Sequence, residues 1–279
     1  MYEFFLTAIV MDDDVLQARA LLQGYCAMPE SHQFHRVLFY RGPDRPSGFK
    51  KVMNLDKIPN GRAFRELQQY LSKQLYVLQA RYPLAAAEFG TARSELSQTL
   101  DQKAGTLRWS DLPEPVVGDQ MHIQRKMLDI PRQDNLLNIL AQNEHTIQSE
   151  YIEESYVWWR ESTEYTLKRD LRYPGDPLPG PPPFAPYHIT APRDGLPPIS
   201  DMTPISSQWI LQVRMLVPEA RPELSNQALR RLKSVVDDLG TSFAFRQYDR
   251  RLFDLRNQAS PGSGMPKPLP PVVRVGGRG

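Results

Sequence analysis

Carboxylates dominate one short stretch of the sequence, SEYIEESYVWWRESTEYTLK, which runs from Ser149 to Lys168 and holds five glutamates and two adjacent tryptophans. Carboxylate oxygens are the ligands of hard divalent cations. An aromatic β-barrel that carries such ligands is typical of tunnel-type metal-dependent phosphatases. Neighbouring ligands on one strand face need i,i+2 spacing, about 6.6 Å at the usual strand rise. The distribution of these glutamates along a strand therefore decides whether they can bind a metal.

The glutamates do not meet that spacing. Glu150 and Glu154 share a face of the expected strand but lie four residues apart, on the order of 13 Å. Glu153 points to the opposite face, and Glu161 and Glu164 fall on opposite faces of the return strand. We also expect no Lys/Arg set on the same faces to receive a triphosphate. We predict no catalytic residue, no cofactor and no metal site, with a metal-dependent triphosphate hydrolase of the tunnel type as the alternative.

No other motif in the sequence carries chemistry. A Gly-rich phosphate loop, GxSxG, HExxH and CxxC are all missing, and the five histidines are scattered. The single cysteine, Cys26, excludes an internal disulfide and suits a buried helix position. A net charge of +2 without a long Lys/Arg block disfavours a third hypothesis, a nucleic-acid-binding barrel. The N-terminal apolar run has no basic leader and is too short to span a membrane, so we interpret it as a strand.

Alternating apolar residues predict a β-rich chain. The clearest strand is Ser207–Val217, because every second residue from Trp209 to Val217 is apolar. Further strands are predicted at Tyr2–Met11, His32–Arg41, Gly105–Ser110, Asp119–Ile130, Ile147–Arg160, Glu161–Arg172 and Thr241–Gln247. Amphipathic helices are predicted after Asp14, after Asp134 and after Pro222. About eight strands favour closure into a barrel, so the predicted fold class is α+β, predominantly antiparallel β, with flanking amphipathic helices.

Three segments depart from this pattern. Residues 60–101 are predicted to form an inserted helical hairpin. One face of it carries Phe64, Leu67, Leu71, Leu75 and Leu78. Residues 173–204 contain eleven of the 26 prolines and are predicted to form an extended loop, with a PxxP ligand as a less favoured interpretation. Residues 259–279 have a disordered composition. We therefore predict one barrel domain over residues 1–258, with a helical insertion at about 60–101, a Pro-rich loop at about 173–204 and a disordered tail.

Several blocks of the sequence carry a resemblance in the same order along the chain. They are YEFFLTAIV, HRVLFYR, the block RKMLDIPRQDNLLNILAQNEHTIQSEYIEESYVWWRESTEYTLKRDL from Arg125 to Leu171, and QWILQVRMLVPE followed by SNQALRRLKSVVDDLG. Together they resemble subunit 18 of the Mediator complex. The segment at 60–101 and the Pro-rich loop have no clear counterpart in the shorter animal members, which suggests a fungal-type member.

The resemblance implies a nuclear β-barrel subunit of the Mediator head module without catalytic residues. Such a subunit couples regulatory factors to RNA polymerase II through protein contacts, and its link to the polymerase is indirect. The resemblance also implies a heterodimer with subunit 20, uptake of the C-terminal helix of subunit 8 and contacts with other head-module subunits. It implies no direct contact with nucleic acid or membrane.

Large apolar side chains are the natural anchors for such contacts. Tyr156, Trp158 and Trp159 are candidates, because successive tryptophans point to opposite faces of a strand and one of them needs cover from outside the barrel wall. Phe64, Leu67 and Leu71 form a second candidate surface. For both groups the alternative is cover by the chain's own helices.

Overall fold

The computed structural model describes residues 1–45, 49, 61–72, 76–90, 100–115, 120–176, 191–193, 195–218 and 221–248, with the backbone alone for 62–64. The strands are β1 (Tyr2–Met11), β2 (Ser31–Arg41), β3 (Val77–Leu84), β4 (Gly105–Ser110), β5 (Ile123–Gln133), β6 (Thr146–Arg160), β7 (Thr163–Arg172), β8 (Thr203–Pro204) and β9 (Gln208–Val217). The α-helices are α1 (Val15–Cys26), α2 (Gly61–Leu71), α3 (Leu136–Gln142) and α4 (Pro222–Leu239).

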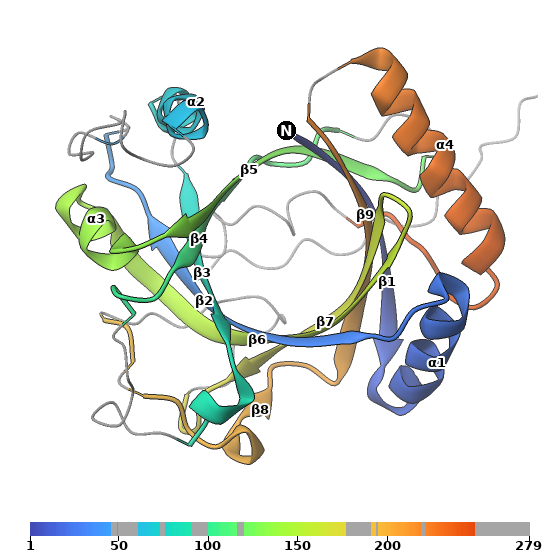
Figure 1. Cartoon of the computed structure of the whole chain (residues 1–279), viewed down its shortest axis with the longest axis horizontal. Coiled ribbons are helices and arrows are strands. Elements are labelled where there is room, and N and C mark those ends of the chain that lie inside the picture. Colours follow the sequence, from blue (N-terminus) through green and yellow to red (C-terminus); the bar gives the residue numbers. More distant parts are fainter. Residues whose placement is uncertain are drawn as a thin grey trace, which may run out of the picture.

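The strands form one closed antiparallel barrel, which Figure 1 shows nearly end-on. Among the described residues, eight strands follow one another in the order β6-β2-β3-β4-β5-β1-β9-β7, and pairing of β7 with β6 closes the ring. The short β8 pairs with β7 beyond the start of β9. The predicted fold class is therefore confirmed. If the paired residues are followed once around the ring, the path returns to β6 about 16 residues away from its starting point. For eight strands, a shift of this size means that the strands are strongly tilted and that the barrel is wide.

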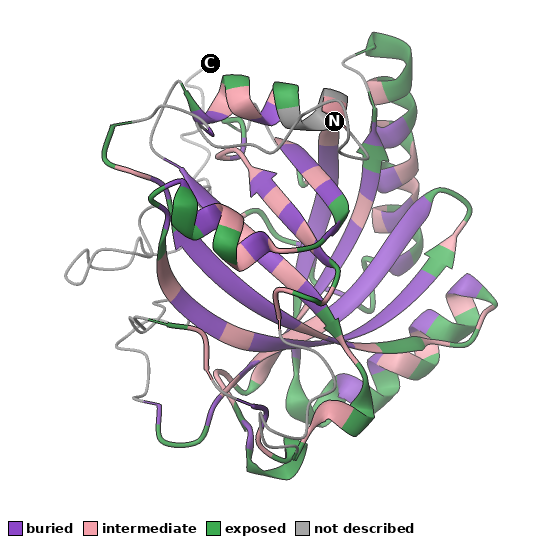
Figure 2. Ribbon diagram, turned by 60° about the vertical axis from the view of Figure 1, so that its left-hand side comes forward, coloured by how far each residue is buried: buried purple, intermediate pink, exposed green. Residues whose placement is uncertain are grey.

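Alternation along the strands sends most apolar side chains to the outside of the barrel. On β1, Phe4 and Leu6 are buried in a cluster with residues of α1 and α4, whereas Glu3 points inward. A second cluster lies beneath α2 and α3. Figure 1 shows these helices around the barrel wall, and Figure 2 shows that the strands beneath them are largely buried. The main hydrophobic core therefore lies between wall and helices, and much of the barrel interior is left to polar residues.

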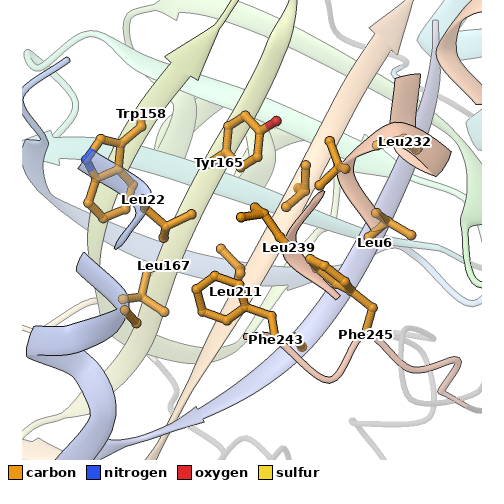
Figure 3. Close-up of a cluster of buried hydrophobic side chains, with 14 of the residues drawn as sticks. Leu6, Leu22, Trp158, Tyr165, Leu167, Leu211, Leu232, Leu239, Phe243 and Phe245 are labelled. Atoms are coloured by element: carbon orange, nitrogen blue, oxygen red, sulfur yellow. The ribbon is translucent and has the colours of Figure 1, made fainter. Parts of the chain in front are cut away.

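The helices that cover β1 and β9 follow the predicted apolar stripes. On α1 the buried residues are Val15, Ala18, Leu22 and Cys26, and on α4 they are Ala228, Leu232, Val235 and Leu239. Helix α1 ends at Cys26 and is followed by the C-cap residue Ala27, whose backbone is left-handed with φ 53°. Figure 3 shows Leu22, Leu232 and Leu239 packed with apolar strand residues of the first cluster. Burial of one helix stripe against a sheet face supplies most of the stability of such a helix.

The predicted helical insertion is correct only in its first part. Helix α2 forms as expected, but Val77–Leu84 is β3, a barrel strand between β2 and β4. Every second residue of β3 packs on its outer face, namely Leu78, Ala80 and Tyr82. The prediction that the first helix of the insertion continues to Pro83 was wrong, because Leu71 and Leu78 also fit a helical spacing, whereas the strand period begins only at Tyr76. The predicted second half of the hairpin, from Glu88 to Leu100, stays a prediction. Residues 91–99 lie outside the described part.

The predicted strand at Thr241–Gln247 was also wrong, since this segment has no strand pairing. Phe243 and Phe245 are both buried in the first cluster, as their spacing suggested. The segment runs beside β1, where the backbone N–H of Arg246 donates to the Thr7 carbonyl at 3.1 Å. The alternation of these two phenylalanines therefore indicated which side chains are buried, but it did not indicate pairing with another strand.

The remaining predictions about organisation concern residues that are only partly described. Residues 177–190 of the Pro-rich loop and the tail at 259–279 lie outside the described part, and the single-domain boundary at 258 stays a prediction. None of the helices that the structure describes has the length and apolar composition needed to cross a membrane.

Candidate interaction surfaces and the barrel interior

The five glutamates of the opening stretch are distributed as the strand period predicts. Glu150 and Glu154 lie on the outer face of β6, and Glu153 lies on its inner face. Glu164 points inward from β7. Glu161 is exposed in the turn between the two strands, with a left-handed φ of 56°. The stretch therefore contributes to three different environments and not to one cluster.

Glu150 occupies a buried polar junction where the Pro-rich loop meets the barrel. Its carboxylate is 0 % exposed and accepts hydrogen bonds from Arg36 Nε at 2.7 Å and from the Tyr173 hydroxyl. The backbone N–H of Arg193 donates a third hydrogen bond at 3.0 Å. Arg36 also donates to the Arg193 carbonyl at 2.7 Å, and Arg193 pairs with Asp176. Glu150 thus fastens two sides of the loop to β2 and β6, which is a structural role.

An ion-pair network runs along the inner face of four neighbouring strands, from β5 through β1 and β9 to β7. Glu3 accepts hydrogen bonds from Arg125 Nε at 2.5 Å and from Gln212 Nε2 at 3.3 Å. Arg214 lies 3.5 Å from Glu3 and forms a two-pronged pair with Glu164 at 2.7 and 2.9 Å. Burial alone would raise the pKa of Glu3, but the guanidinium groups of Arg125 and Arg214 lower this pKa to about 2. Glu3 therefore stays ionised and paired.

A second set of charges lines the other side of the interior. Arg81 donates to Glu153 at 2.6 Å, and Lys168 lies 3.5 Å from the second oxygen of the same carboxylate. Arg108 on β4 binds Asp129 on β5 through two hydrogen bonds of 2.7 Å each. Two-pronged pairs of this kind have the geometry that guanidinium and carboxylate groups favour. One of these sets links β3, β6 and β7, and the other links the neighbouring strands β4 and β5.

Asp170 is an exception within this interior. It lies directly opposite Glu153 in the β6–β7 register, and its carboxylate has no hydrogen bond or ion pair among the described residues. Burial and the neighbouring Glu153 raise the pKa of Asp170 to about 7. On the other side of Glu153, burial and the nearby Arg81 lower the pKa of His35 to about 4, which keeps its ring neutral at pH 7.

The charged interior corrects one expectation. We expected no basic residues on the faces of the glutamates, yet Arg81, Lys168 and Arg214 share the inner face with Glu153 and Glu164. Most of these partners come from distant strands, so local spacing could not reveal them. The bases neutralise the carboxylates. Among the described residues, no group of three or more His, Cys, Asp or Glu side chains is arranged to hold a metal ion.

Two of the candidate anchors on β6 are covered within the chain. Trp158 is fully buried under α1, close to Leu22 in Figure 3. Tyr156 is also buried, with the His32 ring stacked at a centroid distance of 4.4 Å and the Arg19 guanidinium 4.0 Å from its ring centroid. The alternative given for these residues, cover by the chain's own elements, therefore describes both of them.

Trp159 is different, because its side chain is 46 % exposed at the end of β6. It points to the inner-face side, opposite Glu164, which is in turn opposite Arg214 on β9. Leu216, also exposed, follows two residues later on the same face of β9. Two exposed apolar side chains thus lie at the end of the barrel that carries the β6–β7 turn.

The candidate surface on α2 packs against the barrel. Leu67 and Leu71 are buried in the second cluster, and Tyr70 stacks on Trp109 of β4 at a centroid distance of 4.5 Å. The Phe64 side chain lies outside the described part. The described apolar face of α2 is therefore a contact within the chain.

Fold and interior together define a class: a wide antiparallel barrel with its hydrophobic core outside the wall and with charge-compensated side chains inside. The sequence matches the Med18 protein family over residues 2–256. The chain therefore belongs to the Med18 family.

Similar proteins agree in length with this chain. Subunit 18 of the Mediator of RNA polymerase II transcription from Aspergillus clavatus is 22 % identical over 291 residues, covering 92 % of this chain and 99 % of the relative. The Aspergillus oryzae subunit is 21 % identical with the same coverage. A chain in the structure of the Schizosaccharomyces pombe Mediator head module superposes with a TM-score of 0.60 at 13 % identity, over 88 % of this chain and 98 % of that chain. At this low identity, the similarity to the head-module chain shows a shared fold.

Proposed function

We propose that this chain is a structural, non-enzymatic subunit of the Mediator head module and works in the nucleus. The observation that carries the proposal is the family match, which spans nearly all of the barrel. The similarity in fold to a head-module chain supports it. In this role the chain couples gene-specific regulators to RNA polymerase II by protein contacts, and it meets the polymerase indirectly.

The proposed partners are subunit 20, as the second half of a heterodimer, and the C-terminal helix of subunit 8. Both follow from the resemblance of the sequence to its family. The test is co-expression of this chain with subunits 20 and 8 of the same organism, followed by a sizing column. The three chains should elute together. Separate elution of this chain would overturn the proposed partners.

Trp159 is the proposed anchor of one interface, supported by its exposure beside Leu216 at one end of the barrel. Exposed tryptophan is a frequent hot spot of protein interfaces, and its truncation typically costs 2 kcal/mol or more of binding, about thirtyfold in affinity. We expect Trp159→Ala to weaken capture of the partner subunits by roughly that factor. Leu224→Ala, at an exposed position of α4, is the matched control and should leave capture unchanged. Equal capture by both variants would remove Trp159 from the interface.

A triphosphate hydrolase would need a group of interior carboxylates arranged to bind one cation, and the described residues contain no such group. In the described interior, Glu153 is held by Arg81 and Glu164 by Arg214. The purified chain should therefore release no phosphate from a nucleoside triphosphate in the presence of Mn²⁺. Release that disappears in Glu153→Ala would contradict the non-enzymatic proposal.

A further inference from the structure

Among the described residues, the two sides of β1 are paired over unequal lengths. Strand β9 follows β1 along its whole length, from Tyr2 to Met11. On the other side, β5 pairs with β1 only up to Phe5, because β5 begins at Ile123. Within the described part of the chain, the second half of β1 therefore has no strand paired to the side that faces away from β9. Open strand edges are templates for pairing with another chain.

The register identifies the backbone groups that face this edge. The N–H of Asp12 bonds toward β9, so even-numbered residues of β1 pair with β9 and odd-numbered residues face the open side. The Thr7 carbonyl accepts the N–H of Arg246 at 3.1 Å. Beyond it, the N–H and C=O of Ile9 and the N–H of Met11 have no partner among the described residues. An unused row of three backbone groups remains.

The side chains at this edge are apolar, and acidic residues follow them along the chain. Ile9 is 41 % exposed, Met11 is 44 % exposed, and Met121, just before β5, is 45 % exposed. Natural edge strands are usually protected by lysine, proline or a bulge, and this edge has none of these. The exposed Asp12–Asp14 follow directly at its end. The edge therefore suits an extended segment with apolar residues at alternate positions and a basic residue beside the aspartates.

We propose that the open edge of β1 from Ile9 to Met11 receives an extended segment of a neighbouring subunit, which adds a short strand to the barrel wall. This inference rests on the proposed function, since it places the partner within the head module. Main-chain hydrogen bonds give such strand addition its affinity, and side-chain pockets give its specificity. A basic residue of the segment should lie next to the end of β1, beside Asp12–Asp14.

The test is amide hydrogen exchange of the wild-type chain, free and in complex with its head-module partners. In the free chain the Ile9 amide should exchange at least about tenfold faster than the Val10 amide, which is bonded to β9. In the complex the Ile9 amide should slow at least about tenfold, and Val10 should stay protected. If a complete complex forms and Ile9 exchanges as in the free chain, only the strand-addition proposal fails. If no complex forms, the proposed function fails and this inference with it.

A pair of variants gives an independent measurement. Ile9→Pro removes only the N–H that faces the open edge, and proline is tolerated at such edge positions. It should lower the affinity for the complex at least about tenfold, whereas Ile9→Val, which keeps the N–H, should bind normally. Equal binding by Ile9→Pro and Ile9→Val would overturn the proposal.

Discussion

Substitution of Glu150 tests whether this carboxylate is a structural anchor or a free ligand. In Glu150→Gln the guanidinium of Arg36, whose side chain is 3 % exposed, loses the carboxylate that it pairs with and retains the Arg193 carbonyl. Removal of one member of a buried ion pair costs about 3–5 kcal/mol of unfolding free energy. At 2–4 °C per kcal/mol for a chain of this size, the melting temperature should fall by roughly 6–20 °C.

The assay is urea and thermal unfolding of the purified chain in metal-free buffer. Glu161→Gln is the matched control, because the Glu161 side chain is 69 % exposed and its pair with Arg231 is worth about 0–1 kcal/mol. The double variant Glu150→Gln, Arg36→Met should cost less than the sum of the two single changes, since neither charge is then left alone. A loss below about 1 kcal/mol in Glu150→Gln would refute the anchor, and a gain in stability would indicate an unpaired ligand carboxylate.

Further predictions concern burial and pH. Trp158→Ala should cost about 3–5 kcal/mol in urea unfolding and Trp159→Ala less than about 1 kcal/mol; similar losses would contradict their assigned environments. The raised pKa of Asp170, about 7 in the folded chain against about 3.9 when unfolded, means that stability falls as the pH rises from about 4 to 7. The gain in melting temperature from Asp170→Asn should therefore grow between pH 5 and pH 8, and a pH-independent difference would argue against this shift. Burial raises the pKa of the Cys26 thiol to about 11, so alkylation should be slow in the folded chain and fast in urea; equal rates would contradict the buried position.

The strands could be predicted from the sequence wherever the period of two was long and uninterrupted. The predicted strand at Gly105–Ser110 has the observed bounds, and Ser207–Val217 differs from β9 by one residue. The period failed at β3, because leucines at positions 71 and 78 satisfied a helical repeat as well. It failed again at Phe243 and Phe245, which are buried at alternate positions without a partner strand.

The candidate site was less accessible to sequence reasoning. Strand period predicted correctly that Trp158 and Trp159 face different environments, but which one is covered depends on where α1 packs. The interior ion pairs were missed because Arg81 and Glu153 lie far apart in the sequence, on the two strands that flank β2 in the sheet. The open edge of β1 depends on the register with β5, which starts opposite Phe5. Such long-range pairings are properties of the barrel and not of any local stretch.

The central claim is that the chain functions by occupying a place in the Mediator head module. The most direct measurement is native mass spectrometry of the head module reconstituted with all its subunits and this chain. We predict one assembly whose mass includes a single copy of this chain together with subunits 20 and 8. A head module of complete composition that forms without this chain, with the chain remaining as a separate species, would contradict the claim.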